Sequence, residues 1–166
     1  MSTIEVLTES FNFSRGRLLG LLDEIDKLEK PADALGWRPG EGRAHIAWQL
    51  MHVGISEEIF ATEWLAAIDK SPHRQNWSRF RGGSTPDDEI PSSAEIRTVL
   101  ADGRRQLLEQ LASYDDSQLG DVILHHPRMK IDLSLLTVLH IIGYHEAHHQ
   151  GQAHITLNLY KADQKN

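Results

Sequence analysis

Residues 132–160 read DLSLLTVLHIIGYHEAHHQGQAHITLNLY, and this stretch decides the fold. Apolar residues recur in it every three or four positions, which is the period of an amphipathic helix. Asp132 is a plausible N-terminal cap, because its carboxylate can accept hydrogen bonds from the first free backbone N–H groups. The pattern therefore predicts a long helix that runs from Asp132 to about residue 160.

Three further segments show the same helical period. They cover residues 3–29, residues 43–69 and a stretch that begins at Ser92 and ends near residue 113. The first and third begin with capping-box sequences, STIE at residues 2–5 and SSAE from Ser92. Four long amphipathic helices with two long connections predict an all-α fold, a four-helix bundle with long crossover connections.

The connections between these helices differ in character. Residues 31–42 are punctuated by proline and glycine and predict a loop, while Val122, Ile123 and Leu124 indicate a short extended piece. Residues 70–91 show no period, and their length indicates a crossover, a functional loop or a mobile segment. We favour a crossover whose aromatic side chains cover the core.

The composition limits the class of protein. The 166 residues predict a single domain, residues 1–166. The 17 Lys and Arg against 24 Asp and Glu give a net charge of −7, which argues against nucleic acid and against an anionic membrane surface as partners. Arginines interleave with aromatic residues between positions 74 and 81, but the acidic run at 87–89 makes this a poor RNA-binding patch.

Cysteine is absent, which excludes disulfides, cysteine-based zinc sites and iron–sulfur clusters. The N-terminal residues lack the basic region of a signal peptide, and no apolar run approaches the roughly 18 residues that span a bilayer. We therefore expect a cytoplasmic protein.

Histidine is unusually frequent, with ten in the chain, and four fall within ten positions of the last predicted helix. At 3.6 residues per turn, His145 and His149 lie one turn apart in the centre of the apolar stripe, with His148 on its flank. His140 and His154 fall near the opposite side and should face solvent. Two histidines at i and i+4 can chelate one metal ion. The alternative is a pair of core-edge histidines bonded to other helices, and the spacing alone leaves both open.

His52 is the candidate third ligand, because it lies beside an apolar stripe of the second predicted helix and metal sites in bundles use facing helices. Three histidines would leave open metal positions, which is the pattern of a catalytic site rather than a structural one. His45 shares the face of His52, but two turns, about 10.5 Å, separate them along the helix axis. His45 is therefore too far away to bind the same ion.

The sequence HEAHH at residues 145–149 also matches H-E-x-x-H, the metalloprotease signature. In the metzincin metalloproteases this signature continues with Gly and His, but Gln152 and Ile155 occupy those positions here. The gluzincin metalloproteases need a downstream glutamate as the third metal ligand, and no glutamate follows Glu146. A protease of this kind is therefore disfavoured. Glu146 lies about 100° from His145 around the helix, which predicts a solvated surface carboxylate, with general base or support of the ligands as the alternative.

These residues carry a family resemblance. LLTVLH at residues 135–140, followed by HEAHHQGQ at residues 145–152, resembles the fourth-helix signature of the DinB/YfiT-like superfamily, roughly H-x-x-H-H-R-G-Q. The stretch from WRP at residues 37–39 to QLMHV at residues 49–53 is similar to the second-helix segment of that family. Gln150 occupies a position where arginine is usual in this pattern. This departure puts in doubt any contact with an anionic cosubstrate at that position.

The resemblance implies a four-helix bundle of up-down-down-up topology. It implies a divalent metal, zinc or nickel, held by His52, His145 and His149, and it implies a homodimer. The characterised relatives are metal-dependent hydrolases, or transferases and isomerases that use a low-molecular-weight thiol such as bacillithiol, mycothiol or glutathione.

We expect a metal-dependent enzyme that acts on a small molecule. The metal would activate a water or a thiol, and the sequence leaves hydrolysis and S-transfer equally open. A non-catalytic metal-binding bundle is the first alternative. A helical domain whose histidines are satisfied in the core without metal is the second.

Overall fold

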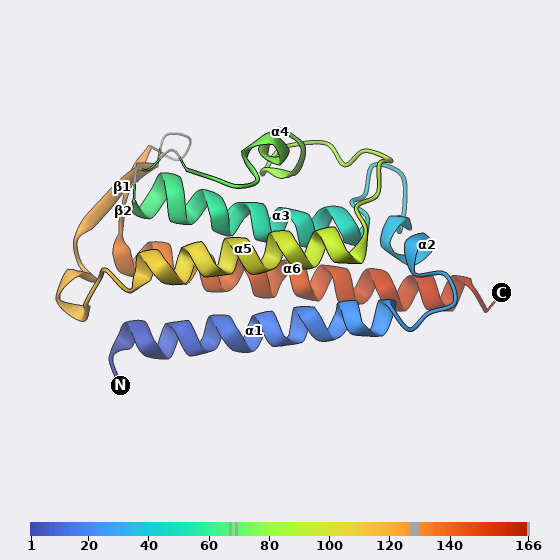
Figure 1. The fold of residues 1–166 in the computed structure, drawn as a ribbon, viewed down its shortest axis with the longest axis horizontal. Coiled ribbons are helices and arrows are strands. Elements are labelled where there is room, and N and C mark those ends of the chain that lie inside the picture. The colour runs from blue at the N-terminus through green and yellow to red at the C-terminus, as the bar shows by residue number, and fades with distance from the viewer. Residues whose placement is uncertain (67, 69, 127–129, 166) are drawn as a thin grey trace.

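Four long helices lie alongside one another in the computed structural model, which describes residues 1–66, 68, 70–126 and 130–165 (Figure 1). These helices are α1 (Thr3–Ile25), α3 (Ile46–Ile59), α5 (Ser93–Leu111) and α6 (Leu135–Asp163). The shorter helical elements are α2 (Pro31–Gly36), the π-helix η1 (Phe60–Leu65), the 3₁₀ turn η2 (Arg74–Asn76), α4 (Trp77–Phe80) and the 3₁₀ turn η3 (Asp116–Gln118). The fold is thus mostly helical, as the sequence predicts.

A small antiparallel sheet departs from the expectation of an all-α protein. Strand β1 (Val122–His126) pairs with β2 (Ile131–Ser134) directly before α6. The apolar run at residues 122–124 correctly indicated an extended piece. The strand that pairs with it was not predicted.

The helix starts follow local signals. Ser2 and Ser92 cap α1 and α5 through complete capping boxes, as predicted. The prediction that Asp132 caps the last helix is wrong, because Ser134 caps α6. Asp132 instead lies in β2 opposite His125, whose Nδ1 is 2.7 Å from its carboxylate. The carboxylate of Asp132 makes a cross-strand contact in the sheet, and the N-cap of the helix is Ser134, two residues later.

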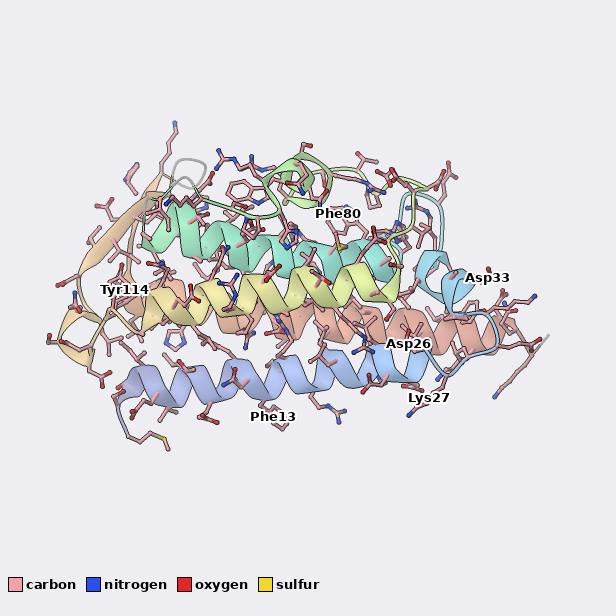
Figure 2. All side chains as sticks on the ribbon, in the orientation of Figure 1. Phe13, Asp26, Lys27, Asp33, Phe80 and Tyr114 are labelled. Carbon is pink, nitrogen blue, oxygen red and sulfur yellow. The ribbon has the colours of Figure 1, made fainter. Side chains whose placement is uncertain are left out.

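Two expected connections gain structure. Residues 31–42 begin with α2, because Pro31 suits the first turn of a helix. The crossover (residues 70–91) runs along the outer side of α3, and Phe80 turns inward from it (Figure 2). Trp77 and Phe80 are both buried in the core. This confirms that its aromatic residues cover the core. In contrast, Phe13 points away from α1 and is 73% exposed.

Helix α3 is buried along its whole length, since it packs between α5, α6 and the crossover. The expected second helix, residues 43–69, is divided into α3 and η1, and positions 67 and 69 lie outside the described residues. None of the described helices combines the length and the apolar character that crossing a bilayer requires.

Four charged side chains, one from each long helix, meet in the interior. Arg15 of α1 and Arg104 of α5 each contact both Glu57 of α3 and Glu146 of α6, and we call these four residues the charge quartet. Arg15 Nε lies 2.6 Å from Glu146 and its Nη2 lies 2.7 Å from Glu57. Each carboxylate therefore faces two guanidinium groups, which offsets the cost of burying the charges.

Candidate metal centre

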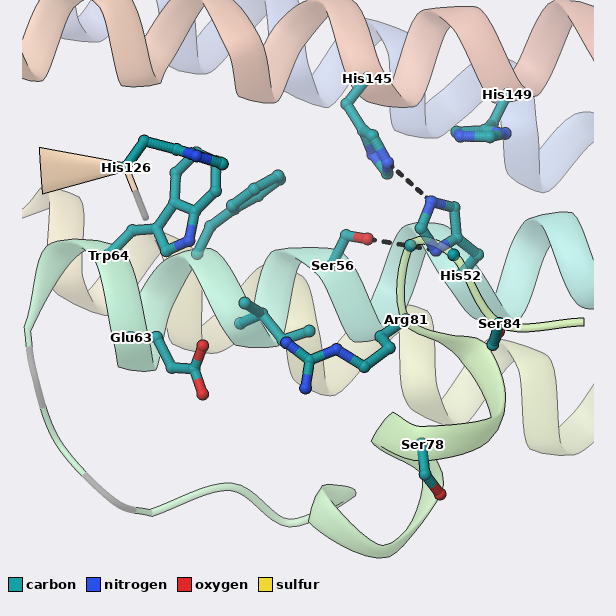
Figure 3. Close-up of a pocket in the computed structure, with 14 residues that line it drawn as sticks. His52, Ser56, Glu63, Trp64, Ser78, Arg81, Ser84, His126, His145 and His149 are labelled. Carbon is teal, nitrogen blue, oxygen red and sulfur yellow. Dashed lines mark hydrogen bonds between the residues drawn. The ribbon is translucent and has the colours of Figure 1, made fainter. Parts of the chain in front are cut away.

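Three histidines converge from two helices that are distant in sequence. His52 comes from α3, whereas His145 and His149 come from successive turns of α6 (Figure 3). One ring nitrogen of each lies within 4.8 Å of the others. We call these residues the three-histidine cluster, and they are the three ligands that the sequence predicts.

The spacing within the cluster suits a shared ion. The Nε2 atoms of His52 and His145 are 3.0 Å apart. Zinc held tetrahedrally by imidazoles at about 2.0–2.1 Å places two ligand nitrogens about 3.3–3.4 Å apart, so only a small adjustment is needed. Nδ1 of His149 is buried and has no hydrogen-bond partner among the described residues. A buried imidazole with an unpartnered nitrogen fits a donor set that is completed by an ion.

The backbone of the crossover orients His52. Its Nδ1 lies 2.6 Å from the carbonyl oxygen of Phe80, and a carbonyl can only accept, so Nδ1 carries the proton. The other nitrogen, Nε2, then has a free lone pair directed at His145. Trp48 stacks on the same ring, with centroids 4.9 Å apart and planes 14° from parallel. Metal-binding histidines are commonly fixed by such an outer hydrogen bond.

Burial keeps the cluster neutral at pH 7. Burial is the largest cause that lowers the pKa of His145 to about 2 and that of His149 to about 4, and His52 adds to both shifts. Burial also lowers the pKa of His52, against the opposing effect of the Phe80 carbonyl. Neutral imidazole is the form that binds metal, so the cluster needs no proton loss at neutral pH.

The other histidines lie where the helical wheel places them. His140 and His154 are exposed, and His148 is an exposed neighbour whose Nε2 lies 2.9 Å from Gln152 Nε2. His45 is not part of the cluster. It caps α3, with Nδ1 accepting from the Trp48 backbone N–H at 3.0 Å.

Glu146 lies elsewhere than the sequence indicated. The expected solvated surface carboxylate is wrong, because Glu146 is 2% exposed and belongs to the charge quartet. Its position one residue after His145 turns it toward α1 and α5, while His145 faces α3. The error arose because the helical wheel has no information about the arginines on other helices. Its proposed role as a general base stays a prediction.

The cluster opens into a cavity of about 730 Å³. Phe60, Trp64 and His126 form an aromatic wall, with ring centroids 4.6 Å apart for Phe60 and Trp64 and 5.4 Å apart for Trp64 and His126. Both Phe60 and Trp64 belong to the π-helix η1, a rare local geometry that is frequent at functional sites. This wall was not predictable from the sequence, since no residue pattern marks the π-helix.

Polar residues of the crossover line the opposite side of the cavity. They include Arg81 and the turn Gly82, Gly83 and Ser84. From the sequence alone, the arginines of the crossover indicated no function other than a poor nucleic-acid patch. The glycine pair at residues 82–83 was the available signal for a turn at this place.

Comparison with known proteins identifies the fold family. A solved structure of a conserved protein from Enterococcus faecalis has a TM-score of 0.69 and 16% sequence identity, and the match covers 96% of this chain and 97% of that one. No curated protein matches the sequence. The family model of the DinB superfamily matches residues 10–153, a range that includes the whole three-histidine cluster. The chain therefore belongs to the DinB superfamily.

Proposed function

We propose that this protein is a divalent-metal enzyme in which His52, His145 and His149 hold a zinc or nickel ion. The observation that carries the proposal is the convergence of three neutral imidazoles beside a cavity. Three protein ligands leave at least one metal position open, as in catalytic zinc sites. A divalent ion bound there would lower the pKa of a coordinated water or thiol and so supply a nucleophile near neutral pH.

The protein side chains prepare this site. The Phe80 carbonyl keeps the proton of His52 on Nδ1, and Trp48 covers one face of the ring. The aromatic wall supplies an apolar surface for a small-molecule substrate next to the cluster. Hydrolysis and S-transfer from a low-molecular-weight thiol both fit this arrangement.

Several wider features complete the proposal. We propose that residues 1–166 act as one domain with the up-down-down-up bundle topology, in the cytoplasm and as a homodimer. The net charge of −7 supports the absence of nucleic-acid and membrane partners. Both oxygens of Glu146 already contact arginines, which favours a structural role for it over that of a base.

Metal content is the decisive first measurement. Protein purified without a histidine tag should contain about one zinc or nickel ion per chain by mass spectrometry. His52→Ala and His145→Ala should both lose the ion, whereas His154→Ala, an exposed change on the same helix, should keep it. A wild type that stays metal-free after reconstitution, or variants that retain the ion, would overturn the proposal.

A second assay distinguishes an enzyme from a metal-binding bundle without activity. The metal-loaded protein is incubated with chlorodinitrobenzene and a panel of thiols, and in parallel with activated esters. Turnover that requires a thiol supports S-transfer, and ester cleavage without a thiol supports hydrolysis. A protein that gains melting temperature from metal but turns over neither substrate class is the non-catalytic alternative.

A further inference from the structure

Arg81 is the one arginine among the described residues that line the cavity beside the three-histidine cluster. Several arginines of this acidic chain have carboxylate partners, among them Arg79 with Asp87 and Arg97 with Asp23, whereas exposed arginines such as Arg17 have none in the described structure. Arg81 has no ion pair or side-chain hydrogen bond in the described part of the chain. Figure 3 shows its side chain reaching along the cavity away from the crossover backbone. An unpaired guanidinium in such a cavity is available for an anionic ligand.

The turn after Arg81 adds hydrogen-bond donors. The Ser84 backbone N–H donates to the Arg81 carbonyl at 3.1 Å, and Gly83 has a φ of 91°, which favours glycine. The N–H groups of Gly82 and Gly83 have no acceptor within the described residues, and both glycines line the cavity. A methyl group built on Gly82 would lie 3.9 Å from Cε1 of His52, so the turn lies against the cluster. Free backbone N–H groups in a turn are a common anion-binding element.

The carboxylate of Glu63 restricts how many negative charges a ligand in the cavity can carry. It lines the same cavity, and Figure 3 shows Glu63 and Arg81 directed toward each other from opposite sides. Their charged groups do not form an ion pair within 4.0 Å in the described structure. A ligand with one negative charge can satisfy Arg81, while a second negative charge would face the carboxylate of Glu63 and be repelled.

We propose that the cavity binds a small monocarboxylate that carries an aromatic or other flat apolar group. Its carboxylate binds Arg81 and the N–H groups of Gly82 and Gly83, and its apolar part packs on the aromatic wall. The volume of about 730 Å³ suits a small molecule. That such a ligand is the substrate rests on the proposed function, because the reacting group would then lie at the three-histidine cluster. The carboxylate subsite itself does not depend on metal.

The test is an NMR titration of ¹⁵N-labelled protein, metal-free and zinc-loaded, with phenylacetate and with its neutral analogue phenylacetamide. Phenylacetate should bind at least about tenfold more tightly, as expected for a charge-assisted hydrogen-bond pair. The backbone amides of Gly82 and Gly83 and the indole N–H of Trp64 should shift. Arg81→Gln should abolish the preference. Arg17→Gln, an exposed change on α1 with the same effect on net charge, should preserve it.

A further variant tests the role of Glu63. Glu63→Gln should strengthen phenylacetate binding and should allow phenylmalonate, a dicarboxylate, to bind as well. Equal affinity for acid and amide, shifts elsewhere in the protein, or a preference that survives Arg81→Gln would overturn the subsite. A subsite confirmed in protein that takes up no metal would refute the proposed function alone. A metal-loaded protein without the preference would refute this inference alone.

Discussion

Nδ1 of His52 lies 2.6 Å from the carbonyl oxygen of Phe80, so a backbone atom of the crossover orients a histidine of α3. Phe80 itself is buried in the core, which fixes the position of that carbonyl. The proposed metal centre therefore depends on the docking of the crossover as well as on the two helices that carry the histidines.

Truncating Phe80 should consequently weaken metal binding although no ligand is removed. Phe80→Ala should lower metal affinity by about 10- to 100-fold, the usual cost of losing an outer partner of a metal-binding histidine. Affinity is measured by competition with a chelator. Leu18→Ala is the control, because Leu18 is equally buried but lies on α1, which carries none of the three histidines and does not supply the carbonyl that bonds His52. Equal affinity losses in both variants would mean that general destabilisation, rather than the carbonyl, is responsible.

Because of the charge quartet, we expect a large loss of stability on substitution of Glu146, the residue next to His145. Glu146→Gln leaves Arg15 and Arg104 with one carboxylate, and removing one partner of a buried ion pair typically costs about 3–5 kcal/mol. Urea unfolding measures this loss. Glu109→Gln breaks an exposed contact with Arg105 and should cost less than about 1 kcal/mol. A loss below about 1 kcal/mol for Glu146→Gln would show that the quartet does not stabilise the fold.

Much of the fold follows from local sequence signals, because these signals act within a few residues. The capping boxes at Ser2 and Ser92 give two helix starts correctly. Helical spacing brings His145 and His149 to one face, and facing helices add His52. These features can be predicted from the helical period and from the residue preferences at helix ends alone.

Features that depend on distant partners were not predictable in this way. Glu146 is buried because two arginines from other helices meet it, and one helical wheel has no information about them. A signal existed, since Arg15 and Arg104 interrupt apolar stripes of their own helices, between Phe11 and Leu18 on α1 in the first case. The π-helix left no comparable mark, because such helices are rare and no residue pattern in residues 60–65 distinguishes it from an α-helix.

Removing metal should make stability sensitive to mild acid. Burial holds the pKa of His149 at about 4, below the ordinary value of 6.5, so the unfolded chain binds protons before the folded one does. The contribution of His149 to the stability of the metal-free protein is therefore fully present above about pH 6.5 and is lost as the pH falls toward 4. One pKa unit corresponds to about 1.4 kcal/mol, so the contribution of this residue is at most about 3 kcal/mol and is reduced by solvent screening of the half-buried ring.

Denaturant unfolding of the metal-free protein at several pH values between 7 and 4.5 measures this effect. His149→Gln should reduce the pH dependence, because it removes one group that must take up a proton on unfolding, while His145 and His52, whose pKa values are also lowered by burial, maintain the rest. His154→Gln is the matched control and should leave the slope unchanged, since His154 is exposed. A wild-type protein whose stability is constant over this range would contradict the prediction.

Helices α3 and α5 approach so closely that glycine is required on both. A methyl group at Gly103 would lie 2.5 Å from the carbonyl oxygen of Gly54, and one at Gly54 would lie 2.8 Å from Cγ1 of Val99. The first contact is with backbone, which cannot rotate away, so Gly103→Ala must push the helices apart. We expect a loss of about 1–3 kcal/mol, the usual range for overpacking a core.

On α1, where the helical glycines have open space around them, we expect a glycine-to-alanine substitution to raise stability instead of lowering it. A methyl group at Gly20 meets nothing within 4 Å, so Gly20→Ala should stabilise the protein by about 0.5–1 kcal/mol through the better helix propensity of alanine. Gly103→Ala and Gly20→Ala each add one methyl group to a helix, so their melting temperatures can be compared directly by thermal unfolding. Because His52 lies on α3 two residues before Gly54, displacement of this helix should also reduce metal occupancy in Gly103→Ala and leave it unchanged in Gly20→Ala. If the two variants shift the melting temperature in the same direction, the close approach of α3 and α5 is not what requires glycine.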